Sequence, residues 1–217
     1  MVKQLKASKR FNGALLLGCM ATFSFMLSLA RYIITDSKMY VFLNWNLFLA
    51  FIPWMLSTII TIYNYQEKKI MLIALLCSWL VFFPNSPYIL TDLFHLKTHS
   101  SAPVWYDWAL ILSFAWTGLM FGFSSLKDIE KILDRYLQKK YVTTLIIVLL
   151  FTASFGVYVG RFLRWNSWDV ISSPLGLGED IFDRVTHPLY HARTWVITLL
   201  NGILLNMMYF SSRILKT

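Results

Sequence analysis

The feature that most constrains the fold is a series of apolar runs, each long enough to cross a membrane. Six runs of about 20 residues carry few charges and are separated by short polar segments. A soluble fold is excluded, because only 14% of the residues are charged, against about a quarter in soluble domains. The sequence therefore predicts an all-α polytopic transmembrane bundle of about six spans.

The predicted spans follow from the positions at which charged residues and prolines interrupt the apolar runs. In chain order they are Phe11–Ile34, Met39–Tyr63, Ile70–Thr91, Val104–Leu126, Tyr141–Leu163 and Thr194–Phe210. The length fits a single integral membrane domain, 1–217, and leaves no room for a soluble domain.

The lysines and arginines are distributed unequally between the two sides of such a bundle. One side receives thirteen of them: Lys3, Lys6, Lys9, Arg10, Lys68, Lys69, Lys127, Lys131, Arg135, Lys139, Lys140, Arg213 and Lys216. The other side receives seven: Arg31, Lys38, Lys97, Arg161, Arg164, Arg184 and Arg193. By the positive-inside rule, both termini are expected in the cytoplasm.

The net charge of +9 does not predict nucleic-acid binding. The basic residues flank the apolar runs, as membrane topology requires, and form no separate basic domain. The lipid bilayer is therefore the expected partner, and no nucleic acid is expected.

The segment Leu126–Tyr141 carries apolar residues at helical spacing, with charges between them. These apolar residues are Ile129, Ile132, Leu133, Tyr136 and Leu137. The pattern predicts an amphipathic helix on the cytoplasmic surface of the membrane.

Two prolines, Pro84 and Pro87, interrupt the third span in its outer third. Each removes a backbone donor and clashes with the preceding turn, and broken helices of this kind line ligand sites in transporters. The alternative is a structural kink with Asn85 hydrogen-bonded to a neighbouring helix. Asn46 of the second span is expected either to hold neighbouring helices together or to hydrogen-bond the opened backbone near Pro84.

Beyond the break, Tyr88, Asp92 and His95 follow at spacings that place them on one face if the α-helix persists. A histidine titrates near neutral pH and a carboxylate can orient it. Asp92 and His95 are therefore candidate catalytic residues. Asp107, at the beginning of the fourth span, is a further candidate.

Arg161 and Arg164 lie one turn apart at the outer end of the fifth span. One interpretation is an ion pair with Asp92, Asp107 or Asp169 that locks helices together. The other is a clamp for a phosphate or carboxylate group at the level of the lipid headgroups. The polar stretch that follows supplies the candidate binding residues Trp165, Asn166 and Trp168 and the candidate catalytic residue Asp169.

All four histidines are expected on the outer side: His95, His99, His187 and His191. His187 and His191 are four residues apart, a spacing at which two histidines can share a metal ion. The pattern lacks a His-Glu-x-x-His motif, so we predict no metal site, with His95, His187 and His191 as the only candidates. The sequence identifies no cofactor.

The connection from Trp165 to Arg193 is the one long loop between predicted spans. Loops of this length are usually functional or disordered. Its many apolar residues predict a segment that is folded or lies at the membrane interface.

Several motifs together resemble a known family. They are Asn46-Leu47-Phe48-Leu49-Ala50, Phe83-Pro84-Asn85-x-Pro87-Tyr88-Ile89-x-Thr91-Asp92-x-x-His95, Trp105-Tyr106-Asp107, and Gly160-Arg161-Phe162-x-Arg164-Trp165-Asn166-Ser167-Trp168-Asp169. The chain is similar, over nearly its whole length, to the bacterial membrane proteins catalogued as domain of unknown function 1361. The resemblance implies a multi-pass protein of the bacterial cytoplasmic membrane and no particular reaction.

Three functions remain open. The first is a membrane-embedded enzyme whose outer polar site acts on a lipid-linked substrate or on an anionic headgroup. The second is a small transporter or flippase, favoured by the broken span. The third is a non-catalytic assembly partner, in which the outer residues form an ion-paired lid.

Overall fold

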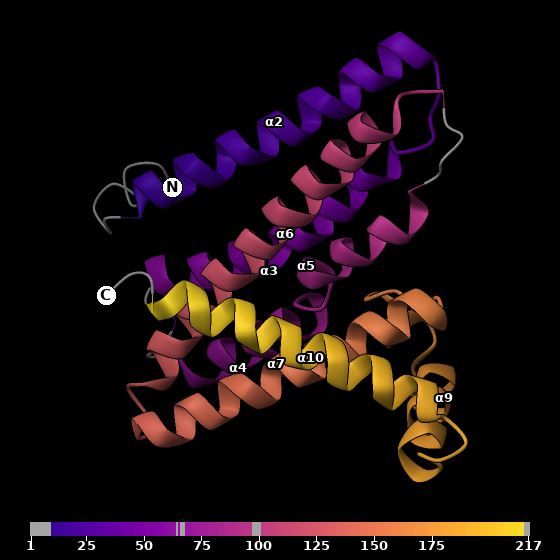
Figure 1. The fold of residues 1–217 in the computed structure, drawn as a ribbon. Coiled ribbons are helices and arrows are strands. Elements are labelled where there is room, and N and C mark those ends of the chain that lie inside the picture. Colours follow the sequence, from indigo (N-terminus) through magenta and orange to yellow (C-terminus); the bar gives the residue numbers. More distant parts are fainter. Residues whose placement is uncertain (1–9, 64, 66–67, 97–100, 215–217) are drawn as a thin grey trace. The chain divides into compact units, whose positions relative to one another are not determined.

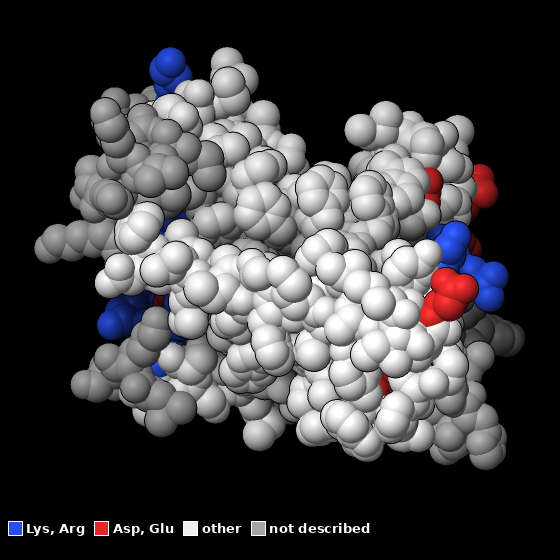
Figure 2. Space-filling model, turned by 90° about the horizontal axis from the view of Figure 1, so that it is seen from above, with Lys and Arg blue, Asp and Glu red and all other residues white. Residues whose placement is uncertain are grey.

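The computed structural model describes residues 10–63, 65, 68–96 and 101–214. Within these ranges it contains helices and no strand. Six helical segments are long and apolar enough to cross a membrane: Phe11–Thr35, Phe42–Ile62, Lys69–His95, Val104–Leu133, Lys139–Phe162 and Ala192–Ile214. The predicted all-α bundle of six spans is confirmed. Much of the surface seen in Figure 2 is uncharged, as lipid contact requires.

The chain forms two compact units, which are described separately. Unit 1 comprises residues 1–132 and unit 2 comprises residues 133–217. The helices of unit 1 are α2 (Phe11–Thr35), α3 (Phe42–Ile62), α4 (Lys69–Phe82), α5 (Asn85–Tyr88), the 3-10 helix η2 (Ile89–His95) and α6 (Val104–Leu133) (Figure 1).

Helix α6 is the central helix of unit 1. Two-thirds of its apolar stretch is buried, against 17% for α2 and 39% for α3. Its polar side chains bond to three neighbours: Thr117 to Ser24 of α2 at 3.3 Å, Asp128 to Ser57 of α3 at 3.0 Å, and Ser125 to Trp79 of α4 at 3.2 Å. Such bonds hold helices together where lipid offers no hydrogen-bonding partner.

Two glycines of α6 let the broken part of the third span approach closely. A Cβ at Gly122 would lie 2.7 Å from Cβ of Ser86, and a Cβ at Gly118 would lie 2.8 Å from Cδ1 of Ile89. Both distances are shorter than a normal carbon–carbon contact. The pair, four residues apart, is a small-residue motif of the kind that packs membrane helices, and it fixes α5 and the beginning of η2 against α6.

Two ion pairs join α2 to α6 at opposite ends. Arg31 Nε lies 2.6 Å from Asp107 Oδ1, and Arg10 Nη2 lies 2.5 Å from Asp128 Oδ2. Arg10 directly precedes α2 and lies 21 residues before Arg31, and the aspartates are 21 residues apart on α6, about 31 Å at about 1.5 Å per residue. Because the hydrocarbon layer is about 30 Å thick, this spacing fits one ion pair at each membrane boundary.

We predicted a separate surface helix over Leu126–Tyr141, and this prediction is wrong. Helix α6 continues without a break to Leu133, and α7 begins at Lys139 after a short turn. Leu126, Ile129 and Ile132 are at most 2% exposed. Their apolar face packs inside unit 1, and the same spacing suits a buried helix end as well as a membrane surface.

Unit 2 contains α7 (Lys139–Phe162), α8 (Asp169–Ser172), α9 (Pro174–Thr186) and α10 (Ala192–Ile214). Helices α7 and α10 lie side by side (Figure 1). Ser154 Oγ donates to the carbonyl of Thr198 at 2.8 Å, and the ring of Phe151 lies directly over Gly202. Helices α8 and α9 fill the long connection between these two spans, as predicted for a folded segment.

Candidate functional site

The broken third span sets the geometry of the candidate site in unit 1. Helix α4 ends at Phe82, whose carbonyl accepts a hydrogen bond from Asn85 Nδ2 at 2.9 Å. Ser86 Oγ donates to the carbonyl of Ala50 in α3 at 3.1 Å. Asn85 thus bonds to the opened backbone of its own span, and Ser86 bonds to the neighbouring helix α3. Pro84 and Pro87 break the span, the Asn85 side chain satisfies one carbonyl at the break, and the Ser86 side chain ties the break to α3.

Helix α3 holds η2 through contacts one helical turn apart. Asn46 Nδ2 donates to Asp92 Oδ2 at 2.9 Å. One turn earlier, the ring of Phe42 meets the ring of His95 edge-on at 5.5 Å, and Tyr40 Oη donates to the carbonyl of His95 at 3.1 Å. Of the two roles expected for Asn46, the structure shows helix cohesion, because its amide bonds to the Asp92 carboxylate and joins the second span to the third.

Asp92 and His95 lie on one face of η2. Residues three apart eclipse each other in a 3-10 helix, and Asp92 and His95 are three apart. Tyr88 is four residues before Asp92 and is therefore rotated by about a third of a turn, so it does not share their face as an α-helix would require. Asp92 is fully buried and His95 is exposed. The carboxylate is thus directed inside unit 1, and the imidazole lies at its surface.

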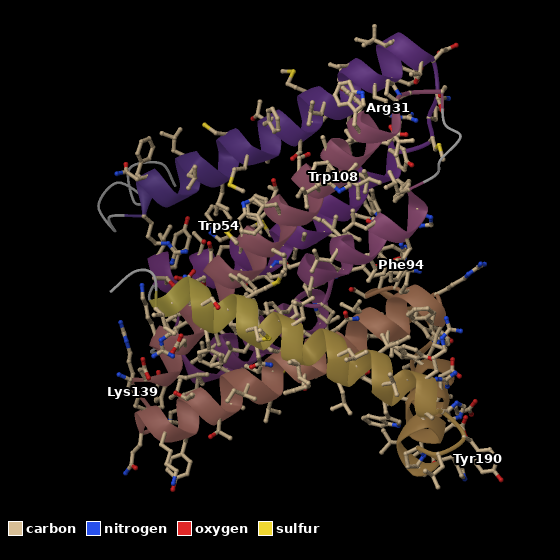
Figure 3. All side chains as sticks on the ribbon, in the orientation of Figure 1. Arg31, Trp54, Phe94, Trp108, Lys139 and Tyr190 are labelled. Atoms are coloured by element: carbon tan, nitrogen blue, oxygen red, sulfur yellow. The ribbon has the colours of Figure 1, made fainter. Side chains whose placement is uncertain are left out.

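Asp107 forms a buried ion pair with Arg31 at the same end of unit 1. Arg31 donates from Nε to Oδ1 at 2.6 Å and from Nη2 to Oδ2 at 3.3 Å, and both side chains are at most 2% exposed. The guanidinium also lies 4.7 Å from the ring centre of Tyr40. Figure 3 labels Arg31 near the end of α2. These contacts give Asp107 the helix-locking role that one interpretation expected, but with Arg31, a partner 76 residues away that the sequence did not indicate.

In unit 2, Arg161 and Arg164 differ in their surroundings. Arg161 is half-buried in the last turn of α7, whereas Arg164 is exposed. Arg164 has a φ of 64°, the left-handed region that favours glycine. It ends the helix, and the following Trp165 N–H donates to the carbonyl of Val159 at 3.4 Å. The backbone at Arg164 is therefore strained, and its guanidinium is exposed.

Trp165 belongs to a bonded group that ties α9 to its neighbours. Its Nε1 donates to Asp180 Oδ2 at 2.6 Å, and Arg184 Nη1 donates to Asp180 Oδ1 at 3.0 Å. The carbonyl of Arg184 accepts a bond from Trp195 Nε1 of α10 at 3.0 Å. Asp180 and Arg184 were not among the predicted residues, although their spacing of four residues on a helix was a usable signal.

Asp169 stabilises the turn that precedes α8. Its Oδ2 accepts from the backbone N–H of Asn166 at 2.7 Å, and its Oδ1 accepts from Ser172 Oγ at 2.8 Å. These bonds, that from the Asn166 backbone first, hold the pKa of Asp169 below its usual range. The neighbouring Trp168 is exposed.

Asp183 binds two of the histidines. Its Oδ1 lies 3.0 Å from His187 Nδ1, and its Oδ2 lies 2.7 Å from His191 Nε2. The bond from His191, followed by that from His187, keeps the pKa of Asp183 below its usual range. In the part of the chain that the structure describes, no three His, Cys, Asp or Glu residues are arranged to hold a metal ion. His99 lies outside the described residues.

The predicted site residues are therefore divided between the units. Asn85, Tyr88, Asp92, His95 and Asp107 belong to unit 1, and residues 161–169, His187 and His191 belong to unit 2. No curated protein and no solved structure matches the chain. The family described as "Protein of unknown function (DUF1361)" matches residues 45–208. This match covers more than half of the chain, including η2 and the connection that contains α8 and α9, and the chain belongs to this family.

Proposed function

We propose that this protein is a membrane-embedded enzyme acting on the headgroup of a lipid-linked or other anionic substrate. One observation carries the proposal: a fully buried carboxylate, Asp92, lies one 3-10 turn from an exposed imidazole, His95, just beyond a broken membrane helix. Intramembrane ionisable residues are costly and mark functional sites by default.

In this proposal, His95 is the general base and Asp92 positions it. The imidazole is at the surface, where a headgroup can reach it. It would accept a proton from the attacking water or hydroxyl and return it to the leaving group. The Asn46 amide fixes Oδ2 of Asp92, so the carboxylate has a defined orientation.

The remaining predicted binding residues are considered for each unit separately. Asn85 and Tyr88 are half-buried beside the break and are proposed as binding residues there. In unit 2, Arg161 and the exposed Arg164 are proposed to bind an anionic group, with Asn166 and Trp168 beside them. We place this chemistry on the outer side of a bacterial cytoplasmic membrane, with both termini in the cytoplasm, as the distribution of basic residues indicates.

The broken span supports a second candidate, a small transporter or flippase. α4 ends at Phe82, and the span continues as a 3-10 helix from Ile89. Discontinuous helices are typical of transporter binding sites. Such a protein would move its substrate without changing it, so chemical turnover separates the two candidates.

The test uses the full chain in nanodiscs, incubated with a bacterial lipid extract and analysed by mass spectrometry of the headgroup-bearing lipids. Wild type should convert one class of lipid to a product, and Asp92→Asn and His95→Gln should not. Asp36→Asn is the matched control, because Asp36 is exposed, lies in the same unit and has a left-handed conformation that Asn accepts. Identical lipid profiles for all four proteins would contradict the enzyme proposal. Movement of an unchanged lipid between leaflets of proteoliposomes would support the second candidate.

A further inference from the structure

Helix α9 separates its apolar and polar residues onto two faces. At 3.6 residues per turn, one continuous arc holds Leu175, Leu177, Gly178, Ile181, Phe182 and Val185. The opposite arc holds Glu179, Asp180, Asp183, Arg184 and Thr186. A helix with this division requires an apolar surface on one side and water on the other.

One side of the apolar arc is uncovered by protein, whereas Leu177 and Ile181 on its other side are half-buried. Leu175 is 81% exposed, Phe182 is 68% exposed and Val185 is 53% exposed. Apolar residues on both sides of α9 are equally exposed, among them Ile171 and Tyr190, and Tyr190 lies at the tip of the connection (Figure 3). Several large apolar side chains exposed within one short segment mark a surface that contacts something apolar.

The polar arc, in contrast, is occupied by bonds within unit 2. Asp180 binds Trp165 and Arg184, and Asp183 binds His187 and His191. These bonds fix the rotation of α9 about its axis, so the apolar arc is held outward.

The position of α9 in the chain identifies its partner. It lies in the connection between α7 and α10, two helices long enough to span a membrane, and Trp195 in the first turn of α10 bonds to the carbonyl of Arg184 in the last turn of α9. Helix α9 is therefore tied to the end of a membrane span, where the available apolar surface is the boundary between lipid headgroups and acyl chains.

We propose that α9 lies on this boundary of the membrane that α7 and α10 cross, with its apolar arc buried in lipid. The attraction comes from apolar area, because three of the four charged residues on the polar arc are acidic: Glu179, Asp180 and Asp183 against Arg184. Most interfacial helices carry basic polar faces that attract anionic lipids. Docking of α9 should therefore not require anionic lipid. This inference is independent of the proposed enzymatic activity.

Site-directed spin labelling of the full chain in phosphatidylcholine nanodiscs tests the proposal. Cys19 and Cys77, both exposed within spans, are replaced by alanine. Single cysteines are then placed on the apolar arc at Leu175, Phe182 or Val185. The matched positions on the polar arc are Glu179 and Thr186, neither of which bonds to another helix. Each label is probed with molecular oxygen, which concentrates in lipid, and with a water-soluble nickel chelate.

Labels on the apolar arc should be accessible to oxygen and protected from nickel, and labels on the polar arc should show the reverse. The pattern should persist when anionic lipid is added. If labels on the apolar arc were protected from both probes, protein would cover that arc. If labels on both arcs were accessible to the nickel chelate, α9 would be surrounded by water. Either result overturns the proposal. Because the apolar arc offers three positions, loss of one variant through misfolding leaves two that decide the question.

Discussion

The buried pair of Arg31 and Asp107 allows the sharpest prediction about stability. The two side chains share two hydrogen bonds, of 2.6 and 3.3 Å, and are at most 2% exposed. Removing one partner leaves a buried charge, which typically costs about 3–5 kcal/mol. Asp107→Leu and Arg31→Met should each lower the free energy of unfolding by about that amount. The double substitution should recover most of the loss, because a buried ion pair can often be replaced by apolar residues at little cost.

The assay is unfolding in mixed detergent micelles by titration with a denaturing detergent, analysed as a double-mutant cycle. Arg10 and Asp128 supply the control, because this pair joins the same two helices but is 18% and 10% exposed. Because these two charges are more exposed to solvent, removing one should lower the free energy of unfolding less, by about 1–2 kcal/mol for Arg10→Met. Two results would contradict this prediction. The first is a smaller loss of unfolding free energy for the single changes at Arg31 and Asp107 than for the change at Arg10. The second is a double variant whose loss equals the sum of the losses of the two single variants.

Three further predictions concern packing, backbone strain and pH. Gly122→Ala should lower the free energy of unfolding by about 1–3 kcal/mol, because the added Cβ would lie 2.7 Å from Cβ of Ser86. Gly18→Ala is the control: a Cβ there has nothing within 4 Å, so the change should be neutral or stabilising by up to about 1 kcal/mol. Equal melting temperatures for the two variants would contradict this prediction. Arg164→Gly should be more stable than Arg164→Ala by about 1 kcal/mol, because glycine accepts the φ of 64°, and equal unfolding midpoints would count against strain there. The pKa of Asp183 is lowered by its bonds to histidines, so this carboxylate stabilises the connection above its unfolded pKa of about 3.9 and loses that effect as pH falls through the lower folded value. Hydrogen exchange at α9 should quicken in that acidic range in wild type, whereas in Asp183→Asn it should show no such step.

Much of the fold could be predicted from the sequence because length and apolarity decide where membrane helices form. The first span was predicted over Phe11–Ile34 and is observed over Phe11–Thr35, and the long final connection is folded as expected. The amphipathic segment after Leu126 was misplaced because a 3.6-residue period cannot distinguish a membrane surface from the interior of a protein.

The residues of the candidate site could be identified from the sequence more readily than their arrangement in space. The spacing of Asp92 and His95 was visible, but whether they share a face with Tyr88 depends on helix type, and the prolines convert the segment to a 3-10 helix. The pairing of Arg31 with Asp107 could not be predicted, because it follows from how α2 packs on α6 and not from any local pattern. The bond from Asn46 to Asp92 depends on helix packing in the same way.

In the proposed function, Asp92 serves chemistry and not merely the packing of η2. The most direct measurement compares the Asp92→Asn variant with wild type in two respects: lipid turnover per folded protein, and melting temperature. An asparagine at this position can still accept the bond from Asn46, so the account predicts an unchanged melting temperature and lost turnover. A variant that loses stability and turnover in proportion, or that retains both, would contradict the claim and assign Asp92 a structural role.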